Sequence, residues 1–504
     1  MSNIIQTSTF LTFGLPRREQ SLPRSGISLL LLLLFAAACG STTDTADGTV
    51  TVPSAIEDTP PPDQVSDTPP CDAPADDVRD QEISDGQGNT QMLDLGTAWL
   101  NVYCTHYASE DVRWHVTTSG VQCPHHVQRL VMLGDPKLEP GARSPGLQDL
   151  IEGKILVPVE EGQLKLESQA ELGISLWTVD ASTTPLAVAQ TLAGEGVLAT
   201  PDYVVLPSPG RMMFPGSLPM LPQSDAIGRP RPPEGNKSGS RIHVLDTGGP
   251  EGAREVDRYV TDNAPDAYVA GHGIFIDGLL RALAPGVDIV HWRVNPQDSL
   301  IAFESDLAAA ALRARANVSE GAMVTNLSMG TTVCDSSISA DDPQFAALLT
   351  QRVVAGVLLR NDGDHLIAAA GNSGQDLPAF PAAFADGEFR EWFAKQLNTV
   401  RSGANADLVA VFVDELAEPK GTLTAVGAEP APPGLFDDPD YSSTGDWITT
   451  TRIGCHESTY PNIRYRYPGS SPDLLVDFPG TVEWCGTSFA APVVTAEIAV
   501  ALGN

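Results

Sequence analysis

The chain has 504 residues, of which 64 are Asp or Glu and only 30 are Lys or Arg, so its formal net charge at pH 7 is −34. This acidic excess argues against nucleic acid and anionic membrane surfaces as partners, because both would repel the protein. The composition suits a soluble exported protein.

The N-terminal segment predicts export. Residues 1–26 are polar, and residues 27–38 form an apolar run that is typical of a signal-peptide core and too short to span a bilayer easily. The run ends in Ala36-Ala37-Ala38-Cys39-Gly40, which resembles the bacterial lipoprotein processing site, where the peptide is cut before the cysteine and the cysteine receives a lipid. We therefore expect a signal peptide over 1–38 and a lipid anchor on Cys39 at the bacterial cell envelope or surface. An ordinary cleavage site beside an incidental cysteine is the alternative.

The segment after Cys39 predicts a spacer. Residues 41–88 are rich in Thr, Asp and Pro, contain no aromatic residue, and have Arg79 as their only basic residue. Such a composition cannot bury enough apolar surface to offset the entropy of ordering. We expect residues 39–92 to form an acidic, disordered tether that holds the protein off the membrane.

Residues 93–150 form a small N-terminal region that is hard to interpret. Strands are predicted at 97–103 and 111–118, with Trp99 and Trp114 as core residues. Several potential zinc ligands cluster in this region: Cys104, His106, Cys123, His125 and His126. Their spacing fits no regular structural zinc pattern, and paired cysteines in an exported chain are more often disulfides. A bridge between Cys104 and Cys123 is therefore the preferred interpretation.

Residues 151–206 alternate between strand-like and helix-like runs. Strands are expected at 154–159, 174–179 and 201–205, and helices at 169–172 and 185–192. Residues 207–238 are rich in Pro and Gly, which predicts an exposed linker suited to proteolytic cleavage. The sequence thus predicts a small α+β segment followed by a linker.

Residues 239–504 alternate more regularly. Apolar runs that predict strands lie at 242–245, 287–292, 323–327, 366–370 and 423–426, and helix-like runs lie at 306–316 and 344–358. This alternation predicts a parallel sheet covered by helices on both faces. A longer stretch at 383–420, with a helix-like run at 388–397, is interpreted as a surface insertion.

Two motifs in this region can supply a general base and its partner. Asp246 ends the buried run 241–245, where a carboxylate can orient an imidazole and stabilise the imidazolium formed in a reaction. His272 lies between two glycines and begins an apolar segment, 274–283, that predicts a buried helix. Taken singly, the first motif is usually a turn and the second a loop.

A third motif can supply a nucleophile. Ser488 follows Gly486-Thr487 and opens a helix predicted at 489–502. A helix N-terminus offers unpaired N–H groups and a positive dipole end, which stabilise the negative charge of an acyl-transfer intermediate. Gly-Thr-Ser alone is also a common helix start.

The order Asp, His, Ser separates the unrelated folds on which such triads occur. With Asp246, His272 and Ser488 in that order and Asn372 between the last two, the chain resembles the subtilases, the subtilisin-like serine peptidases, over residues 240–504. The resemblance implies an α/β, subtilisin-like fold of three layers with a mostly parallel sheet. It also implies a serine endopeptidase that acts on protein or peptide substrates.

The resemblance assigns further residues around the reaction centre. The side chain of Asn372 would point at the developing oxyanion. The strand that pairs with the substrate backbone and a wall of the first specificity pocket would be formed by Ser328, Met329 and Gly330 and by Ala369, Ala370 and Gly371. These small, apolar linings favour an apolar or aromatic side chain before the scissile bond. Asp277 stands where subtilases usually have a small residue, and we interpret it as a solvated or capping carboxylate.

Residues 151–206 resemble a subtilase prodomain, chiefly in their ending at Pro201–Val205. A prodomain assists folding and blocks the cleft until it is cut away, so we expect a zymogen; a small spacer without inhibitory role is the alternative. A catalytically silent subtilase fold that binds peptides as a surface lipoprotein is the second function. We expect a monomer without a cofactor or metal, although subtilases often bind calcium. The sequence ends soon after the Ser488 helix, where subtilases usually continue, and this should lower stability.

The cysteines fit an exported chain. Seven occur, and with Cys39 assigned to a lipid, six remain for up to three bridges. Connectivity does not follow from sequence alone. Cys455 and Cys485 both lie in the final section of the catalytic region and are the preferred pair.

Overall fold

The structure, a computed structural model, describes residues 64–66, 81–84, 90–93, 111–116, 122–133, 144–159, 172–207, 221, 241–250, 267–295, 301–318, 321–332, 343–374, 377–401, 420–429, 441–466 and 475–503. All of them belong to one compact unit, Pro60–Asn504. The predicted signal peptide and Cys39 lie outside the described residues. No helix within these ranges is long and apolar enough to cross a membrane.

The predicted tether is not uniformly disordered. Within residues 39–92 the structure has three short strands, β1 (Gln64–Ser66), β2 (Gln81–Ser84) and β3 (Thr90–Leu93). β2 and β3 pair antiparallel with each other, and β1 pairs with β4 (Val112–Val116). The other residues of 39–92 lie outside the described residues, so the tether stays a prediction.

A six-stranded, entirely parallel sheet forms the centre of the region after residue 239. Its strands follow the order β10-β9-β12-β14-β16-β17, and every neighbouring pair is parallel. The strands are β9 (Arg241–Asp246), β10 (Asp288–Arg293), β12 (Val324–Leu327), β14 (His365–Ala369), β16 (Thr422–Glu429) and β17 (Thr450–Ile453). Five of the six coincide with apolar runs in the sequence, which confirms the predicted parallel sheet.

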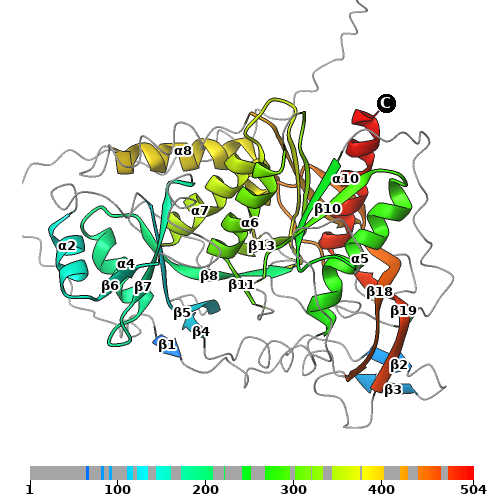
Figure 1. Ribbon diagram of the computed structural model, residues 1–504, viewed down its shortest axis with the longest axis horizontal. Helices are drawn as coiled ribbons and strands as arrows, with labels where there is room; N and C mark the ends of the chain where they lie inside the picture. Colours follow the sequence, from blue (N-terminus) through cyan, green and yellow to red (C-terminus); the bar gives the residue numbers. More distant parts are fainter. Residues whose placement is uncertain are drawn as a thin grey trace, which may run out of the picture. The chain divides into compact units, whose positions relative to one another are not determined.

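Helices cover both faces of this sheet and complete three layers (Figure 1). One face packs on α5 (Ala267–Leu283) and α10 (Thr487–Leu502), and the other on α6 (Glu304–Ala316) and α7 (Pro343–Leu358). Successive side chains of β9 serve opposite faces, as strand geometry requires. Val244 packs with Phe275 and Ala490, while Leu245 packs with the α6 and α7 side chains.

A second large sheet is antiparallel, so a mostly parallel architecture is only partly correct. Its main path is β1-β4-β5-β8-β13-β15, with β6, β7 and β11 attached at its sides. These strands are β5 (Gln122–Leu133), β6 (Leu156–Pro158), β7 (Ile174–Val179), β8 (Ala199–Pro207), β11 (Ala302–Phe303), β13 (Met329–Thr332) and β15 (Ala379–Phe380). The predicted α+β segment and the predicted catalytic region therefore share one sheet.

The long strand β5 removes the predicted boundary at residue 150. It pairs with β4, β7 and β8, so residues 122–133 belong to the same sheet as residues 151–207. The helices α2 (Pro145–Glu152) and α4 (Pro185–Ala193) pack on this sheet, with Leu147 and Val188 in one core with Trp177. Trp114 is fully buried, as predicted.

The stretch at 383–420 is not a simple surface insertion. It contains the end of the 3-10 helix η2 (Ala382–Ala385) and all of α8 (Gly387–Arg401). Phe393 and Leu397 are buried in a core that also holds Phe345 of α7 and Phe384 of η2. Residues 402–419 lie outside the described residues.

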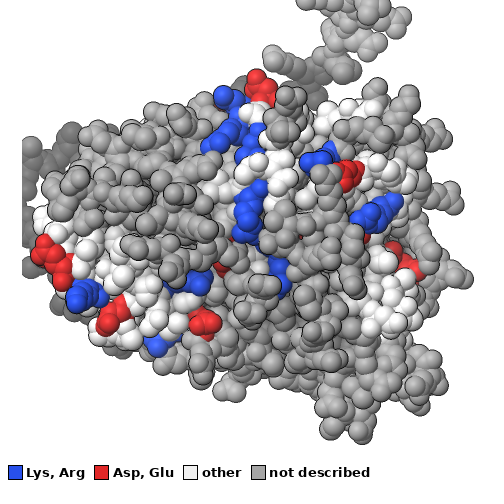
Figure 2. Space-filling view, viewed as in Figure 1, with Lys and Arg blue, Asp and Glu red and all other residues white. Residues whose placement is uncertain are grey.

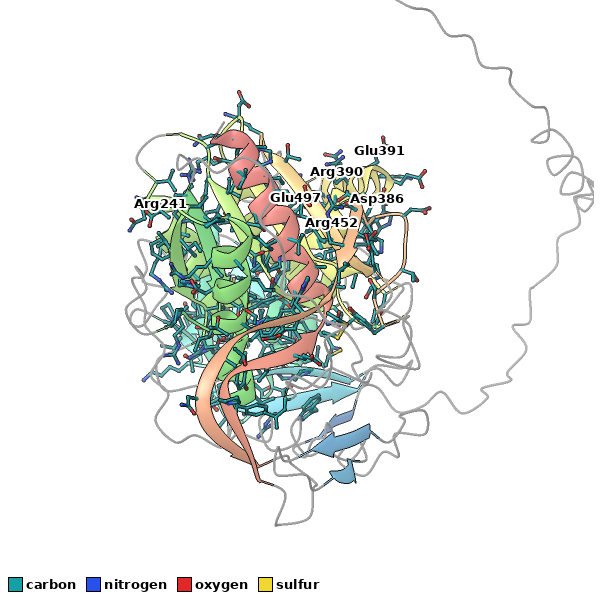
Figure 3. All side chains as sticks on the ribbon, turned by 90° about the vertical axis from the view of Figure 1, so that its right-hand side faces the viewer. Arg241, Asp386, Arg390, Glu391, Arg452 and Glu497 are labelled. Carbon is teal, nitrogen blue, oxygen red and sulfur yellow. A yellow bond between two sulfur atoms is a disulfide. The ribbon has the colours of Figure 1, made fainter. Side chains whose placement is uncertain are left out.

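The remaining elements bring the chain towards Ser488. A long antiparallel hairpin, β18 (Cys455–Arg466) and β19 (Leu475–Cys485), leads into α10. Arg452 of β17 forms two hydrogen bonds of 3.0 and 2.6 Å to the carboxylate of Glu497, which ties the edge strand to α10 (Figure 3). On the face shown in Figure 2, the described Lys and Arg side chains are as prominent as the described Asp and Glu side chains.

Candidate active site

Asp246 and His272 lie in direct contact at the carboxyl end of β9. The Nδ1 of His272 donates a hydrogen bond of 2.8 Å to Oδ1 of Asp246, and both side chains are almost fully buried. The same oxygen accepts hydrogen bonds from the backbone N–H of Thr247, at 2.8 Å, and from its hydroxyl, at 3.3 Å. In a parallel sheet the carboxyl ends of the strands lie at one edge, where ligands commonly bind. The short turn after β9 holds the Asp246 carboxylate at this edge.

The glycines beside His272 allow close packing. His272 lies inside α5 rather than before the helix, which corrects the sequence interpretation. A Cβ at Gly271 would clash with the ring of Tyr460, and one at Gly273 with the carbonyl of Gly248. Gly248 has φ +124°, a conformation that favours glycine. The motif therefore lets α5 lie against both the Asp246 turn and β18.

Ser488 lies in the first turn of α10 and is enclosed by Ser328. Its Oγ donates to the carbonyl of Ser328 at 3.0 Å, and the hydroxyl of Ser328 donates to the carbonyl of Ser488 at 2.8 Å. The Nε2 of His272 is buried and has no hydrogen-bond partner among the described residues. The next residue, Phe489, brings its ring centre within 5.2 Å of the His272 ring, so the Ser488 turn and the base lie side by side.

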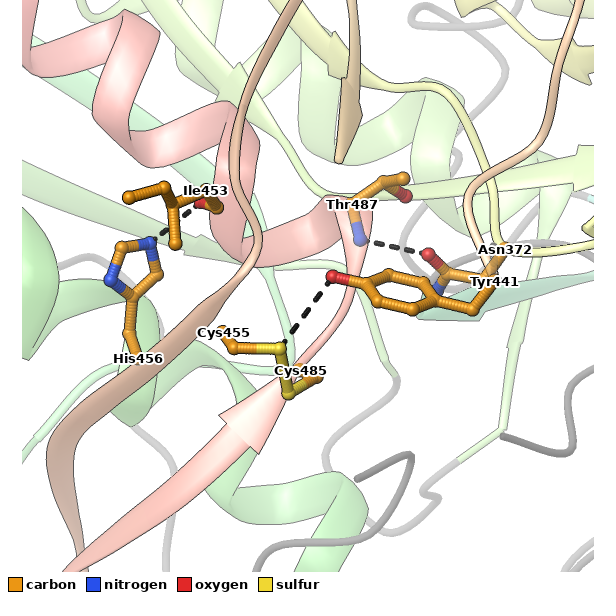
Figure 4. The surroundings of a disulfide bond; sticks show 7 residues. All are labelled: Asn372, Tyr441, Ile453, Cys455, His456, Cys485 and Thr487. Carbon is orange, nitrogen blue, oxygen red and sulfur yellow. Dashed lines mark hydrogen bonds between the residues drawn. A yellow bond between two sulfur atoms is a disulfide. The ribbon is translucent and has the colours of Figure 1, made fainter. Parts of the chain in front are cut away.

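Asn372 is held against the same turn (Figure 4). Its Oδ1 accepts a hydrogen bond of 2.8 Å from the N–H of Thr487, and the Thr487 hydroxyl accepts one of 3.1 Å from the N–H of Gly371. A Cβ built on Gly486 would lie 3.5 Å from Asn372 Nδ2. This Nδ2 is buried and has no partner within the described ranges. The arrangement leaves an oriented amide donor beside Ser488.

The predicted substrate strand is already paired. Gly330 and Met329 of β13 lie opposite Leu206 and Pro207 of β8 in an antiparallel register. The side chain of Met329 is buried in the core with side chains of α6, while its backbone pairs with β8. Of the predicted pocket wall, Ala369 ends β14, and Ala370 follows it, fully buried, just before Gly371.

Aromatic residues that the sequence analysis missed surround His272. Trp484 lies edge-on to the imidazole, with ring centres 5.5 Å apart and planes at 88°. Phe275 contacts both Trp484 and Phe489, at 5.7 and 4.5 Å between ring centres. The sequence offers one signal for these rings, which is their closeness to the motifs. Trp484 lies four residues before Ser488, Phe489 one residue after it, and Phe275 three residues after His272.

The disulfide Cys455–Cys485 is present, as expected, and joins residues directly opposite each other at the start of β18 and the end of β19 (Figure 4). It lies three residues before Ser488. Cys123 is also disulfide-bonded, but its partner lies outside the described residues, so the predicted pairing with Cys104 is untested.

Three of the potential zinc ligands, Cys123, His125 and His126, lie among the described residues and each has a bond of its own. Cys123 is in a disulfide, and the Nδ1 of His125 donates to the carbonyl of His126 at 2.9 Å. The Nδ1 of His126 accepts from the N–H of Gln128 at 3.0 Å, and burial lowers the pKa of His126 to about 3. Across the described ranges, no three His, Cys, Asp or Glu side chains gather as a metal site would require.

Asp277 is neither solvated nor a cap, which corrects the sequence interpretation. It is 3% exposed and accepts hydrogen bonds from His291 Nε2, at 2.8 Å, and from Arg281 Nε, at 2.7 Å. Burial alone would raise the pKa of Asp277, but the hydrogen bonds and charges of His291 and Arg281 bring it below its ordinary value. Asp277 therefore fastens α5 to the edge strand β10.

No model of a known protein family matches the chain, and no curated protein matches it. Among solved structures, fervidolysin from Fervidobacterium pennivorans, a keratinolytic enzyme related to subtilisin, has 14% identity and a TM-score of 0.42, covering 75% of this chain and 55% of that one.

Two further structures are similar in the same way. EpiP, the epidermin leader peptide processing serine protease from Staphylococcus aureus, has 12% identity and a TM-score of 0.39, covering 75% of this chain and 88% of that one. A mutant form of the protease domain of PatA has 20% identity and a TM-score of 0.31, covering 53% and 80%. All three TM-scores are below 0.5, so the chemistry of the site has to be inferred from its own side chains.

Proposed function

We propose that this chain is a serine endopeptidase in which Ser488 is the nucleophile and His272 the general base. Asp246 orients the base, and Asn372 donates to the oxyanion. The observation that carries the proposal is the hydrogen bond from His272 Nδ1 to Asp246, combined with a buried Nε2 that is left over beside the Ser488 turn. A base oriented in this way has one nitrogen fixed and the other ready to take a proton.

The reaction would proceed by acyl transfer. The hydroxyl of Ser488 would turn from the carbonyl of Ser328 to Nε2 of His272, give up its proton there, and attack the scissile carbonyl. The resulting oxyanion would accept hydrogen bonds from Asn372 Nδ2 and from an N–H at the start of α10. His272 would then protonate the leaving amine, and water would release the acyl group by the same steps in reverse order.

The substrate would be a protein or peptide that pairs with β13 as an added strand. Such pairing supplies backbone hydrogen bonds without sequence preference, while pockets for side chains supply specificity. The small residues Ala369, Ala370 and Gly371 favour an apolar or aromatic side chain before the scissile bond. No cofactor is required by this chemistry.

We further propose that the chain is a zymogen that processes itself. β8 ends the predicted prodomain and pairs with β13, where a substrate would pair, and this register supports an inhibitory role. Pro207, the last residue of β8, pairs with Met329, whose neighbour Ser328 accepts the Ser488 hydroxyl through its carbonyl. Because the junction is tethered to its own site, its effective concentration can reach the millimolar range, so cutting should be intramolecular.

A fluorophosphonate probe tests the proposed nucleophile. It phosphonylates a serine hydroxyl only where a base activates it, so the purified protein should be labelled at Ser488. His272→Ala should lose the label, while Thr444→Ala, which removes the hydroxyl of an exposed residue, should keep it. Absence of label in the processed wild type would overturn the proposal.

One observation favours a second function, a catalytically silent peptide-binding lipoprotein. The hydroxyl of Ser488 is bonded to Ser328 rather than to His272, and β13 already carries a strand. A protein of this kind would bind extended peptides at β13 and never react with a fluorophosphonate, so the same probe separates the two functions.

Export and anchoring are proposed from the sequence alone. A signal peptide over 1–38 and a lipid on Cys39 would place the protein, as a monomer, at the cell envelope. A radiolabelled fatty acid should mark the wild type, and Cys39→Ala should be released from membranes. Equal retention of both proteins without label would exclude the anchor.

A further inference from the structure

One aromatic side chain is placed to control the orientation of His272 without touching the reacting atoms. The hydrogen bond to Asp246 fixes Nδ1 of His272, but a single bond leaves the ring free to tilt about it. The rings of Trp484 and Phe489 flank the imidazole, at 5.5 and 5.2 Å between centres. They restrict the tilt that moves Nε2 relative to Ser488.

Trp484 is itself rigidly held. It is 4% exposed and packs edge-on against Phe275 and Tyr460, at 5.7 and 6.0 Å between ring centres. The next residue is Cys485, whose disulfide to Cys455 closes the end of the hairpin. A ring confined in this way cannot move aside when the imidazole presses on it.

The hairpin also connects the base to the nucleophile. Along β18, Tyr460 lies against Gly271, and the hydroxyl of Ser458 donates to the carbonyl of Phe275 at 2.8 Å, so the hairpin lies on the helix that carries His272. Its other strand, β19, ends three residues before Ser488. Trp484 lies where these two connections meet.

We propose that Trp484 is a positioning residue that sets the tilt of the His272 ring and so aims Nε2 at Ser488. The inference rests on the proposed function. An error in the aim of a base slows proton transfer while leaving substrate contacts in place, and misplacement on the order of 1 Å can cost about 100-fold in rate. Loss of the ring should therefore lower kcat and leave KM nearly unchanged.

The test compares three variants of the full chain after self-processing. Trp484→Leu removes the ring, Trp484→Phe keeps one, and Phe478→Leu is the matched control, because Phe478 is buried in the same hairpin against Tyr460. The measurements are kcat and KM on a peptide substrate, the rate of fluorophosphonate labelling at Ser488, and the melting temperature.

We expect Trp484→Leu to lose about 10- to 100-fold in kcat and in labelling rate with KM within about twofold. Trp484→Phe should recover most of that loss, and Phe478→Leu should lower only the melting temperature. If Trp484→Leu does not fold, Trp484→Met replaces it, and kcat of Trp484→Phe must exceed that of Trp484→Met.

Three results would overturn the proposal: unchanged kcat in Trp484→Leu, equal losses in Trp484→Leu and Phe478→Leu, or a rise in KM alone, which would assign Trp484 to substrate contact. Failure of the proposed function is distinguishable, because the wild type itself would then take no fluorophosphonate label.

Discussion

The molecule buries carboxylates in two places, with opposite surroundings. At the end of β9, Asp246 directs one oxygen at three donors, the imidazole of His272 and both polar groups of Thr247. Where β8 meets α6, Asp202, Glu304 and Asp306 are buried near one another. Asp246 is thus surrounded by hydrogen-bond donors, whereas the β8–α6 contact brings three buried carboxyl groups together.

The β8–α6 contact has few positive partners. Asp202 accepts two hydrogen bonds from Ser305, through its N–H at 3.0 Å and its hydroxyl at 2.6 Å, and lies 4.0 Å from Arg129. Glu304 accepts from Gln351 at 3.1 Å through one oxygen, while the other has no partner among the described residues. The two bonds between Ser305 and Asp202 connect the predicted prodomain to the first turn of α6, while the bond between Gln351 and Glu304 joins α6 to α7.

Their pKa values follow from this setting. Burial raises the pKa of Asp202, although Arg129 opposes the shift, and raises the pKa of Glu304 well above its ordinary value. Burial, and then the charge of Asp202, raises the pKa of Asp306 to about 7. Asp246 thus has donors that orient an imidazole, while burial raises the pKa values of Asp202, Glu304 and Asp306, so the β8–α6 contact should be sensitive to pH.

The largest expected effect lies at the first place. Asp246→Asn keeps the shape but turns the wrong group towards His272 Nδ1, and should lower kcat by about 10⁴-fold. The control Asp288→Asn removes a half-exposed carboxylate that is bonded to Arg241 on the same sheet, and should change kcat by less than about twofold. Steady-state kinetics on a peptide substrate measure both, and similar kcat values in the two variants would refute the role of Asp246.

The next effect concerns the donor beside Ser488. Asn372→Ala removes the free Nδ2 and should lower kcat by about 10²- to 10³-fold with little change in KM. Asn317→Ala, at the exposed C-cap of α6, is the matched control and should leave both constants near those of the wild type. A rise in KM without loss of kcat would place Asn372 in substrate binding instead.

The smallest effect lies at the β8–α6 contact and depends on pH. Because the pKa of Asp306 rises from 3.8 to about 7 on folding, the folded chain binds more protons than the unfolded chain between these values. The contribution of Asp306 to the free energy of unfolding is therefore greatest below about pH 4. It falls as the pH rises towards and through about 7. Glu304, with its pKa raised well above normal, extends the fall to higher pH.

Glu304→Gln removes one of these titrations. In a Ser488→Ala background, the loss of unfolding free energy between pH 5 and pH 8 should be smaller in Glu304→Gln than in the parent protein. Glu388→Gln, at an exposed position of α8, should leave the loss unchanged. Urea unfolding at the two pH values measures this, and equal losses in all proteins would show that the contact acids are not linked to folding.

Sequence reasoning reached the parallel sheet because its strands are buried on both faces and read as apolar runs, such as 242–245 and 366–370. It singled out Asp246, His272 and Ser488 because three short motifs follow one another in the order that resembles the subtilases. It missed the pairing of β8 with β13, since antiparallel contacts between distant segments leave no local pattern.

The interpretation of Asp277 failed for a related reason. Asp277 lies on α5, but its partner His291 comes from β10, a different element. The aromatic ring of Trp484 was missed because its role depends on the hairpin that returns it to His272. Residues whose function lies in tertiary contact are the ones that a sequence pattern does not reveal.

Ser488 is proposed as a nucleophile whose first substrate is the predicted prodomain. N-terminal sequencing of purified wild type and Ser488→Ala, kept apart from other proteases, tests this most directly. We expect a new N-terminus shortly after Pro207 in the wild type, formed at a rate that does not depend on protein concentration. Ser488→Ala should remain uncut. Cleavage at the same position and rate in both proteins would contradict it.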